Sequence, residues 1–263
     1  MKVALCFLIS GEQILNQERL WREWIEPNKD IINVYFHYTK YETIRSSWIR
    51  EHTLPPQFIV NTSYYHVVPA YFSLMTYAMM ADKENKWFCF LTDACAPIIS
   101  PSKFLTLFEE HREKSIMTWK RAWWNPTYQK RANLRYLFRE YHLGNDPWFV
   151  LTKQDALSCL QFRKRETRMF NIVCRGGLAN ESIFAIILKF CNRLPGVINK
   201  VTHLTDWERM ESPTSPYMFR EMTAENERFI KAGLQKNEMV MFLRKVAPEF
   251  PEKYIHQLTS CVG

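Results

Sequence analysis

Short apolar runs alternate with helix-like patterns at the start of the chain. Residues 3–9 and 31–38 are apolar runs of strand length, and leucines and tryptophans recur at helical spacing between them. A strand, a helix and a second strand within 36 residues predict a βαβ unit. Because such units join parallel strands, the pattern predicts an α/β fold with a parallel sheet.

A third strand is predicted at residues 87–91, an apolar and aromatic-rich run without Gly or Pro. Such a run is typical of a strand buried on both faces. The chain then leaves regular structure over residues 92–100, and Ser100 followed by Pro101 predicts the start of a helix. The intervening loop carries Asp93. Since ligands bind at the carboxyl ends of strands in open α/β sheets, Asp93 is a candidate binding residue.

Further elements follow from the same reasoning. We expect strands at residues 58–61 and 115–119, a helix that begins at Pro69, a helix over residues 153–162 capped by Thr152, and a helix capped by Thr223. Two apolar segments, 201–207 and 239–246, complete the pattern. The sequence shows no internal repeat and no Gly- or Ser-rich linker, which indicates a single domain over residues 1–263.

Composition supports a globular protein with an anionic partner. The 263 residues are 47% hydrophobic and 15% aromatic, and the formal net charge is +8. This charge suits a nucleotide diphosphate, nucleic acid or a membrane surface, although a basic surface that only aids solubility is equally consistent with it.

Cysteine usage and the first residues bear on the compartment. The seven cysteines form no C-x-x-C pair, and several lie in apolar runs, so we expect buried free thiols in a reducing environment. The apolar run after Met1 is too short for a signal peptide, and no run approaches the roughly 20 residues of a membrane span. These features predict a cytoplasmic protein without a membrane span, in a host cytoplasm if the chain is microbial or viral.

Glu181 is the main candidate for acid–base chemistry. Apolar residues at helical spacing follow it, and Asn180 is a natural N-cap, so we expect Glu181 in the first turn of a helix. A helix N-terminus favours the ionised carboxylate, which suits a general base. The alternative is a glutamate that only stabilises the helix.

A tryptophan-rich basic stretch, residues 119–128, is a candidate acceptor loop. Trp123 and Trp124 could stack on the apolar faces of sugars, and the neighbouring lysines and arginines could meet anions. Two alternatives remain: the tryptophans belong to the core, or the stretch binds single-stranded nucleic acid. No recognisable nucleic-acid-binding fold accompanies it, so no nucleic-acid partner is expected.

The chain contains no D-x-D motif, in which two aspartates can hold a divalent metal beside a diphosphate. A protein that binds a diphosphate without this motif has to meet its negative charge with basic side chains. Arg244 and Lys245, at the end of an apolar run, are the candidates, and no metal or other cofactor is expected.

Six short segments, in order, resemble the core-2/I-branching β-1,6-N-acetylglucosaminyltransferase family, which also contains the protein xylosyltransferases. They lie at residues 4–11 with 34–37, 91–98, 145–153, 180–184, 201–207 and 239–246. The resemblance implies a GT-A type fold, with a Rossmann-like nucleotide half at about 1–110 and an acceptor and diphosphate half at about 111–263.

The resemblance also implies roles for single residues. Glu181 would be the catalytic base, Lys245 with Arg244 would hold the donor diphosphate, and Gly11 and His37 would lie on the nucleotide side. The acceptor would meet Asp146, Trp148 and Trp207, together with the tryptophan-rich loop. Gly11 and His37 could equally be a turn glycine and a polar residue at a strand end.

Two departures from the family pattern leave the acceptor open: Asn180 stands where the family has aspartate, and Asp146-Pro147 where it has Gly-Ser. The resemblance implies an inverting, metal-independent transferase that moves GlcNAc or xylose from a UDP-sugar to a hydroxyl of a glycan or glycoprotein. The alternatives are a catalytically silent relative that binds sugars or nucleotides, and a basic nucleic-acid-binding protein. The sequence leaves the donor sugar, the acceptor and the oligomeric state open.

Overall fold

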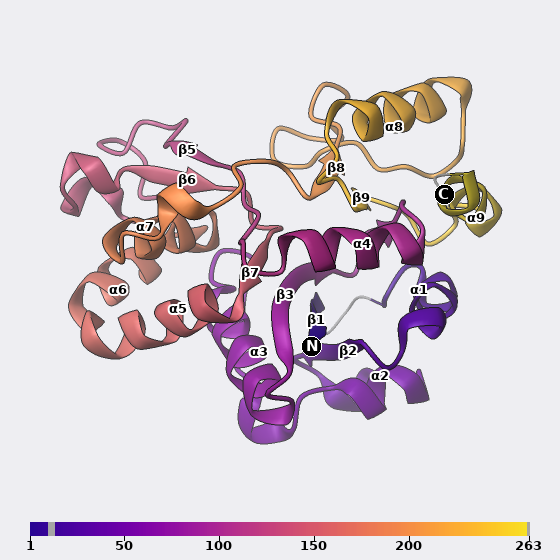
Figure 1. Cartoon of the computed structure of the whole chain (residues 1–263). Coiled ribbons are helices and arrows are strands. Elements are labelled where there is room, and N and C mark those ends of the chain that lie inside the picture. The colour runs from indigo at the N-terminus through magenta and orange to yellow at the C-terminus, as the bar shows by residue number, and fades with distance from the viewer. Residues whose placement is uncertain (10–13, 262–263) are drawn as a thin grey trace.

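The protein is described by a computed structural model that covers residues 1–9 and 14–261 (Figure 1). Its central sheet has four strands in the order β2-β1-β3-β7. The first three are parallel, and β7 runs antiparallel to β3. Their bounds are Lys2–Ile9 for β1, Ile32–Tyr38 for β2, Asn85–Thr92 for β3 and Val150–Thr152 for β7. The predicted α/β class with a mostly parallel sheet is therefore confirmed.

Helices flank this sheet, and two small sheets extend it. The helices are α1 (Glu18–Ile25), α2 (Ser47–His52), α3 (Val68–Ala81), α4 (Pro101–His111), α5 (Lys153–Arg165), α6 (Thr167–Cys174), α7 (Ile183–Phe190), α8 (Ala224–Lys236) and α9 (Glu252–Cys261). One small sheet joins β4 (Cys95–Pro97), β9 (Phe242–Arg244) and β8 (His203–Thr205). The other pairs β5 (Trp119–Arg121) with β6 (Leu143–Asn145).

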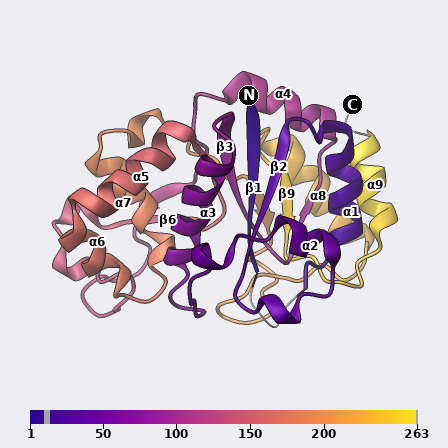
Figure 2. The ribbon, with the colours of Figure 1, turned by 90° about the horizontal axis from the view of Figure 1, so that it is seen from below.

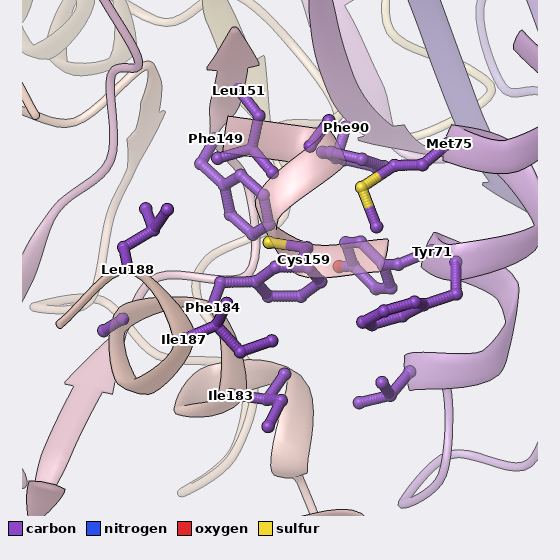
Figure 3. Packing of buried hydrophobic residues seen from close by; sticks show 14 of the residues in the cluster. Tyr71, Met75, Phe90, Phe149, Leu151, Cys159, Ile183, Phe184, Ile187 and Leu188 are labelled. Atoms are coloured by element: carbon purple, nitrogen blue, oxygen red, sulfur yellow. The ribbon is translucent and has the colours of Figure 1, made fainter. Parts of the chain in front are cut away.

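Strand β3 is buried on both faces, as its sequence predicts. Its side chains alternate between two cores, with Phe88 and Phe90 in one and Trp87, Cys89 and Leu91 in the other. The first core lies under α3, α5, α6 and α7, where aromatic rings meet around Phe184 (Figure 3). The second lies under α1, α2 and α4 on the opposite face of the sheet (Figure 2).

Helix starts agree with the capping signals in the sequence. The Ser100 hydroxyl accepts from the Lys103 N–H at 3.1 Å, and Pro101 opens α4. Thr152 and Thr223 cap α5 and α8 in the same way. Each cap satisfies a backbone donor that a helix leaves unpaired at its N-terminus.

Two predicted strands differ from the structure. Residues 58–61 form no strand. The Val60 N–H donates to the His37 side chain, at Nε2, over 3.1 Å and not to the carbonyl of a neighbouring strand. In the segment 115–119, Ile116 makes only isolated bridges, and the regular strand is β5, which begins at Trp119. The loop expected over residues 92–100 also contains a short strand, β4, which forms only because β9 pairs with it.

Side-chain hydrogen bonds fasten the N-terminal part both to the C-terminal part and to β4. Gln17 Nε2 donates to the Ala247 carbonyl at 2.9 Å, and Trp21 Nε1 donates to the Cys95 carbonyl at 2.9 Å. These groups are buried, so each bond satisfies a polar atom that cannot reach water. Residues beyond 231 therefore belong to the same packed unit as β1 and β3.

Cysteine chemistry agrees with the expectation of free thiols. Cys6, Cys89, Cys95 and Cys159 are buried and unbridged, while Cys174 and Cys191 are partly buried. Burial raises the pKa of the Cys89 thiol, which makes it a poor nucleophile. No helix within the described residues is both long enough and apolar enough to cross a membrane.

We expect Phe184→Ala to lower the free energy of unfolding by about 3–5 kcal/mol, because it removes a ring from the centre of the first core. Phe184 is fully buried and packs against Tyr71 and Phe149 with ring centroids 5.2 and 4.7 Å away. Urea denaturation measures the change. Met80→Ala on α3, where the side chain is 65% exposed, serves as the control and is expected to shift stability by less than about 0.5 kcal/mol. Equal losses for both variants would contradict this assignment of the core.

Candidate active site

The site lies at the edge of the sheet that is formed by the strand ends, where β3 reaches its carboxyl end. Because β7 is antiparallel to β3, the residues that precede β7 reach the same edge. The Phe90 N–H donates to the Phe149 carbonyl at 3.0 Å, which holds the segment before β7 beside the end of β3. This pairing brings Trp148 close to Asp93 and its loop.

Arg244 and Lys245 reach this edge from β9. The antiparallel pairing of β9 with β4 places Arg244 opposite Cys95, two residues after Asp93. Arg244 donates to the Thr92 hydroxyl, and its guanidinium lies 4.6 Å from the centre of the Trp148 ring. Lys245 Nζ donates to the Ser215 hydroxyl at 2.9 Å. The predicted basic pair is thus joined to the end of β3.

The charges around this pair perturb one another. Burial and the neighbouring Arg244 lower the pKa of Lys245, while Asp93 and Glu211 act in the opposite direction. Burial raises the pKa of Asp93, and the charges of Arg244 and Lys245 oppose that rise. Two adjacent cations in a partly buried place favour an anion beside them, because a negative charge would relieve their repulsion.

His203 belongs to this group, although the sequence gave no reason to select it. It is buried on β8, and its ring centre lies 6.1 Å from that of Trp148. Burial, followed by the charge of Arg244, lowers its pKa well below the usual value, so the imidazole is neutral near pH 7. Its Nδ1 lies 3.0 Å from the Thr202 hydroxyl.

Glu181 lies in the turn before α7 and forms an ion pair with Arg131. Both side chains are mostly shielded, with exposed fractions of 18% for Glu181 and 22% for Arg131. The Arg131 guanidinium also lies 4.3 Å from the centre of the Trp124 ring and 5.3 Å from that of Trp123. The two tryptophans therefore hold the cation that pairs with the candidate base.

The local structure around Glu181 differs from the prediction. Residues Ala179–Glu181 form a single 3-10 turn, and α7 begins two residues later, at Ile183, without a side-chain cap. Asn180 is therefore not an N-cap. Its backbone carbonyl instead accepts from Asn145 Nδ2 at 2.9 Å, which fixes the turn to β6.

A close backbone approach places Arg131 beside this turn. A Cβ atom at Gly176 would lie 2.4 Å from the Asn133 nitrogen, so only glycine fits there. The Ala132 N–H donates to the Gly177 carbonyl at 2.9 Å. The glycines of this loop thus bring the segment that carries Arg131 against the segment that carries Glu181.

Tyr71 connects the two sides of the site. Its hydroxyl donates to the Pro147 carbonyl at 2.7 Å and also meets the side-chain amide of Asn180. Burial raises the pKa of Tyr71, and the positive charge of Arg244 opposes that rise. Tyr71 thus joins the turn that carries Glu181 to the segment that carries Trp148, whose ring lies against Arg244.

The comparisons with known proteins agree with this geometry. The family model for the Core-2/I-Branching enzyme matches residues 5–231. The chain belongs to this family of glycosyltransferases. No curated protein matches the chain at a significant level.

The family match ends before Arg244 and Lys245, so their assignment depends on the structure and on the segment at residues 239–246. Glu181, Asp93 and Trp148 lie within the matched part.

The remaining acceptor candidates have mixed surroundings. Trp124 is buried, as one alternative held, whereas Trp123 is 48% exposed and lies over Gly144. Trp207 is 46% exposed. It lies two residues after Thr205, the residue of β8 that is paired with Arg244 of β9. Asp146 is partly buried and follows directly after β6.

The nucleotide-side candidates are less closely tied to the site. His37 is buried on β2, which β1 separates from β3. Burial lowers the pKa of His37 to about 4, so the ring is neutral and accepts from Val60 as a structural residue. Gly11 lies outside the described residues.

Several buried polar atoms around the site have no hydrogen-bond partner within the described residues. They are Arg131 Nε, Trp124 Nε1, Asn180 Oδ1, Ser182 Oγ, His203 Nε2 and Arg244 Nε. Such atoms are ordinarily paired, so their concentration here fits a place that binds polar molecules. In the same described part, no group of three or more His, Cys, Asp or Glu side chains could hold a metal ion.

We expect Asp146→Asn to change the pH dependence of stability. Burial raises the pKa of Asp146 to about 6, against the opposing charge of Lys120. The folded protein therefore keeps this proton up to about pH 6, whereas the unfolded chain releases it near pH 4. The parent loses stability as the pH rises between these values, and the asparagine variant lacks that loss.

Urea denaturation between pH 4 and pH 7 measures the difference. The variant is expected to gain about 2 kcal/mol relative to the parent over this range. A difference between the two proteins that stays constant with pH would contradict the assignment.

Proposed function

We propose that the protein is an inverting, metal-independent glycosyltransferase that moves a sugar from a UDP-sugar to a hydroxyl of a glycan or glycoprotein. The observation that supports the proposal is a chain of contacts: Tyr71 meets Asn180, the neighbour of Glu181, and donates to Pro147, the neighbour of Trp148, whose ring lies against Arg244. Family membership supports the transferase class. The resemblance favours GlcNAc or xylose as the transferred sugar.

Glu181 acts as the general base. It takes the proton of the acceptor hydroxyl while that oxygen attacks the anomeric carbon of the donor from the face opposite UDP. The bond from that carbon to the UDP oxygen breaks, and the electron pair leaves with the diphosphate, so the configuration inverts. A single carboxylate suffices for this step, because no covalent intermediate forms.

Arg131 keeps the base in its reactive form. A guanidinium paired with a carboxylate favours the ionised state, and the two tryptophan rings fix the guanidinium in place. Glu181 is thus held ionised and oriented before the acceptor arrives. Arg131 acts here as a positioning residue.

Arg244 and Lys245 take the part that a metal ion plays in related chemistry. Negative charge accumulates on the diphosphate as the bond to the sugar breaks, and two fixed cations stabilise that charge. Burial and the charge of Arg244 lower the pKa of Lys245. A bound diphosphate would raise this pKa again, because its negative charge stabilises the protonated lysine. Trp148 orients Arg244 by stacking against its guanidinium.

We expect Glu181→Gln to lower the rate of transfer at least about 100-fold, because the amide cannot accept the proton. UDP affinity is expected to stay within about twofold of the parent. Transfer of radiolabelled sugar and calorimetric titration with UDP measure the two quantities. Glu113→Gln, which removes an exposed carboxylate from the same half of the chain, is the control and keeps full activity.

Transfer retained by Glu181→Gln would remove Glu181 from the mechanism. A parent protein that binds UDP but transfers from no donor to any acceptor tested would favour the catalytically silent relative.

UDP binding is expected to survive EDTA and to depend on the basic pair. Calorimetric titration of the parent gives the same affinity in EDTA and in manganese, while Lys245→Met weakens it at least about tenfold, because a charge-assisted contact is lost. GDP serves as the competing nucleotide. Binding that requires manganese would keep the transferase class but contradict the role of Arg244 and Lys245.

A further inference from the structure

Positive charge is concentrated in residues 119–142, here called the basic–aromatic segment. It contains six Lys and Arg residues and one acid, Glu140, which gives a net charge of +5 against +8 for the whole chain. The cations are Lys120, Arg121, Lys130, Arg131, Arg135 and Arg139. The segment includes all of β5. The chain then continues through β6 to Asp146.

Most of these cations are not neutralised within the protein. Among the described residues, only Arg131 forms an ion pair with a carboxylate, that of Glu181. Surface cations elsewhere, such as Arg19 and Arg220, do form such pairs. The segment therefore presents net positive charge to solvent beside the site.

An exposed indole ring lies close to two of the cations. Lys120 Nζ lies 5.1 Å and the Arg131 guanidinium 5.3 Å from the centre of the Trp123 ring. Trp123 packs against Gly144, where a Cβ atom would approach the ring to 2.5 Å, yet 48% of the side chain stays exposed. A sugar ring that contacts this indole would lie close to Lys120.

The opposite face of β5 is also cationic. Because side chains alternate along a strand, Arg121 points away from Lys120. Arg121 and Arg139 line a hollow of about 360 Å³, together with Ala122, Pro126 and His142. No carboxylate lines this hollow, and exposed aromatic side chains lie nearby in the sequence at Tyr128, Tyr136 and Phe138.

We propose that the acceptor is an anionic glycan, with sulfate, phosphate or carboxylate groups, and that the basic–aromatic segment binds it. This inference rests on the proposed function, because Glu181 beside the segment has to meet a sugar hydroxyl. The first anionic group meets Lys120 beside Trp123, and a longer chain reaches Arg121 and Arg139. Aromatic faces bind the apolar faces of the sugar rings, and the cations select acceptors that carry negative charge.

Calorimetric titration tests the proposal directly, with three hexasaccharides as probes: neutral chitohexaose, sulfated chitohexaose and hexagalacturonate. We expect the two anionic probes to bind at least about tenfold more tightly than the neutral one at low salt. Lys120→Gln and the double variant Arg121→Gln with Arg139→Gln are each expected to weaken binding of the anionic probes about fivefold to tenfold.

The matched control is Lys253→Gln on α9. Lys253 Nζ lies 5.0 Å from the Tyr254 ring, which reproduces the contact of Lys120 with Trp123 far along the chain. This variant is expected to bind the anionic probes like the parent. Equal loss in Lys253→Gln, equal affinity for neutral and anionic probes, or tighter binding of a twelve-residue oligothymidylate would each overturn the proposal.

UDP titration of the same variants separates this inference from the proposed function. The variants are expected to bind UDP like the parent, since Lys120, Arg121 and Arg139 are not part of the basic pair. A parent that fails to bind UDP contradicts the proposed function, whatever the glycan probes show. UDP binding without preference for the anionic probes contradicts the acceptor class alone.

Discussion

The burial of β3 on both faces is the constraint on which the site depends. Its side chains fill two separate cores, so the strand has one possible register between β1 and β7. That register fixes where β3 ends and therefore where Thr92 and Asp93 lie. Since β7 runs the opposite way, the residues before it meet the same edge. One buried strand thus fixes where Thr92 and Asp93 lie relative to the segment that carries Trp148.

Charge organises the site around that edge. Arg244 and Lys245 lie next to each other in partly buried surroundings, a costly arrangement that a bound anion would stabilise. Across the site, Glu181 already has its cation, Arg131, held by two tryptophans. The two places therefore differ: a bound anion would relieve the repulsion between Arg244 and Lys245, whereas Glu181 already has its counter-ion.

The positions that depart from the family pattern take part in hydrogen bonds, mostly through their backbones. The Asp146 N–H donates to the Thr118 carbonyl at 3.0 Å, and the Pro147 carbonyl accepts from Tyr71. Asn180 uses its backbone to accept from Asn145 and its side chain to meet Tyr71. These positions lie next to the surface that we assign to the acceptor.

The sequence by itself determined the parallel strands, the capped helices and the family, because hydrophobic periodicity, capping residues and motif order are local properties. It also singled out Glu181 and the Arg244–Lys245 pair. Only the tertiary structure decided that Arg131 pairs with Glu181 and that His203 and Tyr71 border the site, since these contacts join residues far apart in the chain. The structure also differs from the expected strand at residues 58–61, where the Val60 N–H donates to the His37 side chain and not to a neighbouring strand. Local patterns specify elements, whereas the partners of buried polar and charged groups depend on how those elements pack.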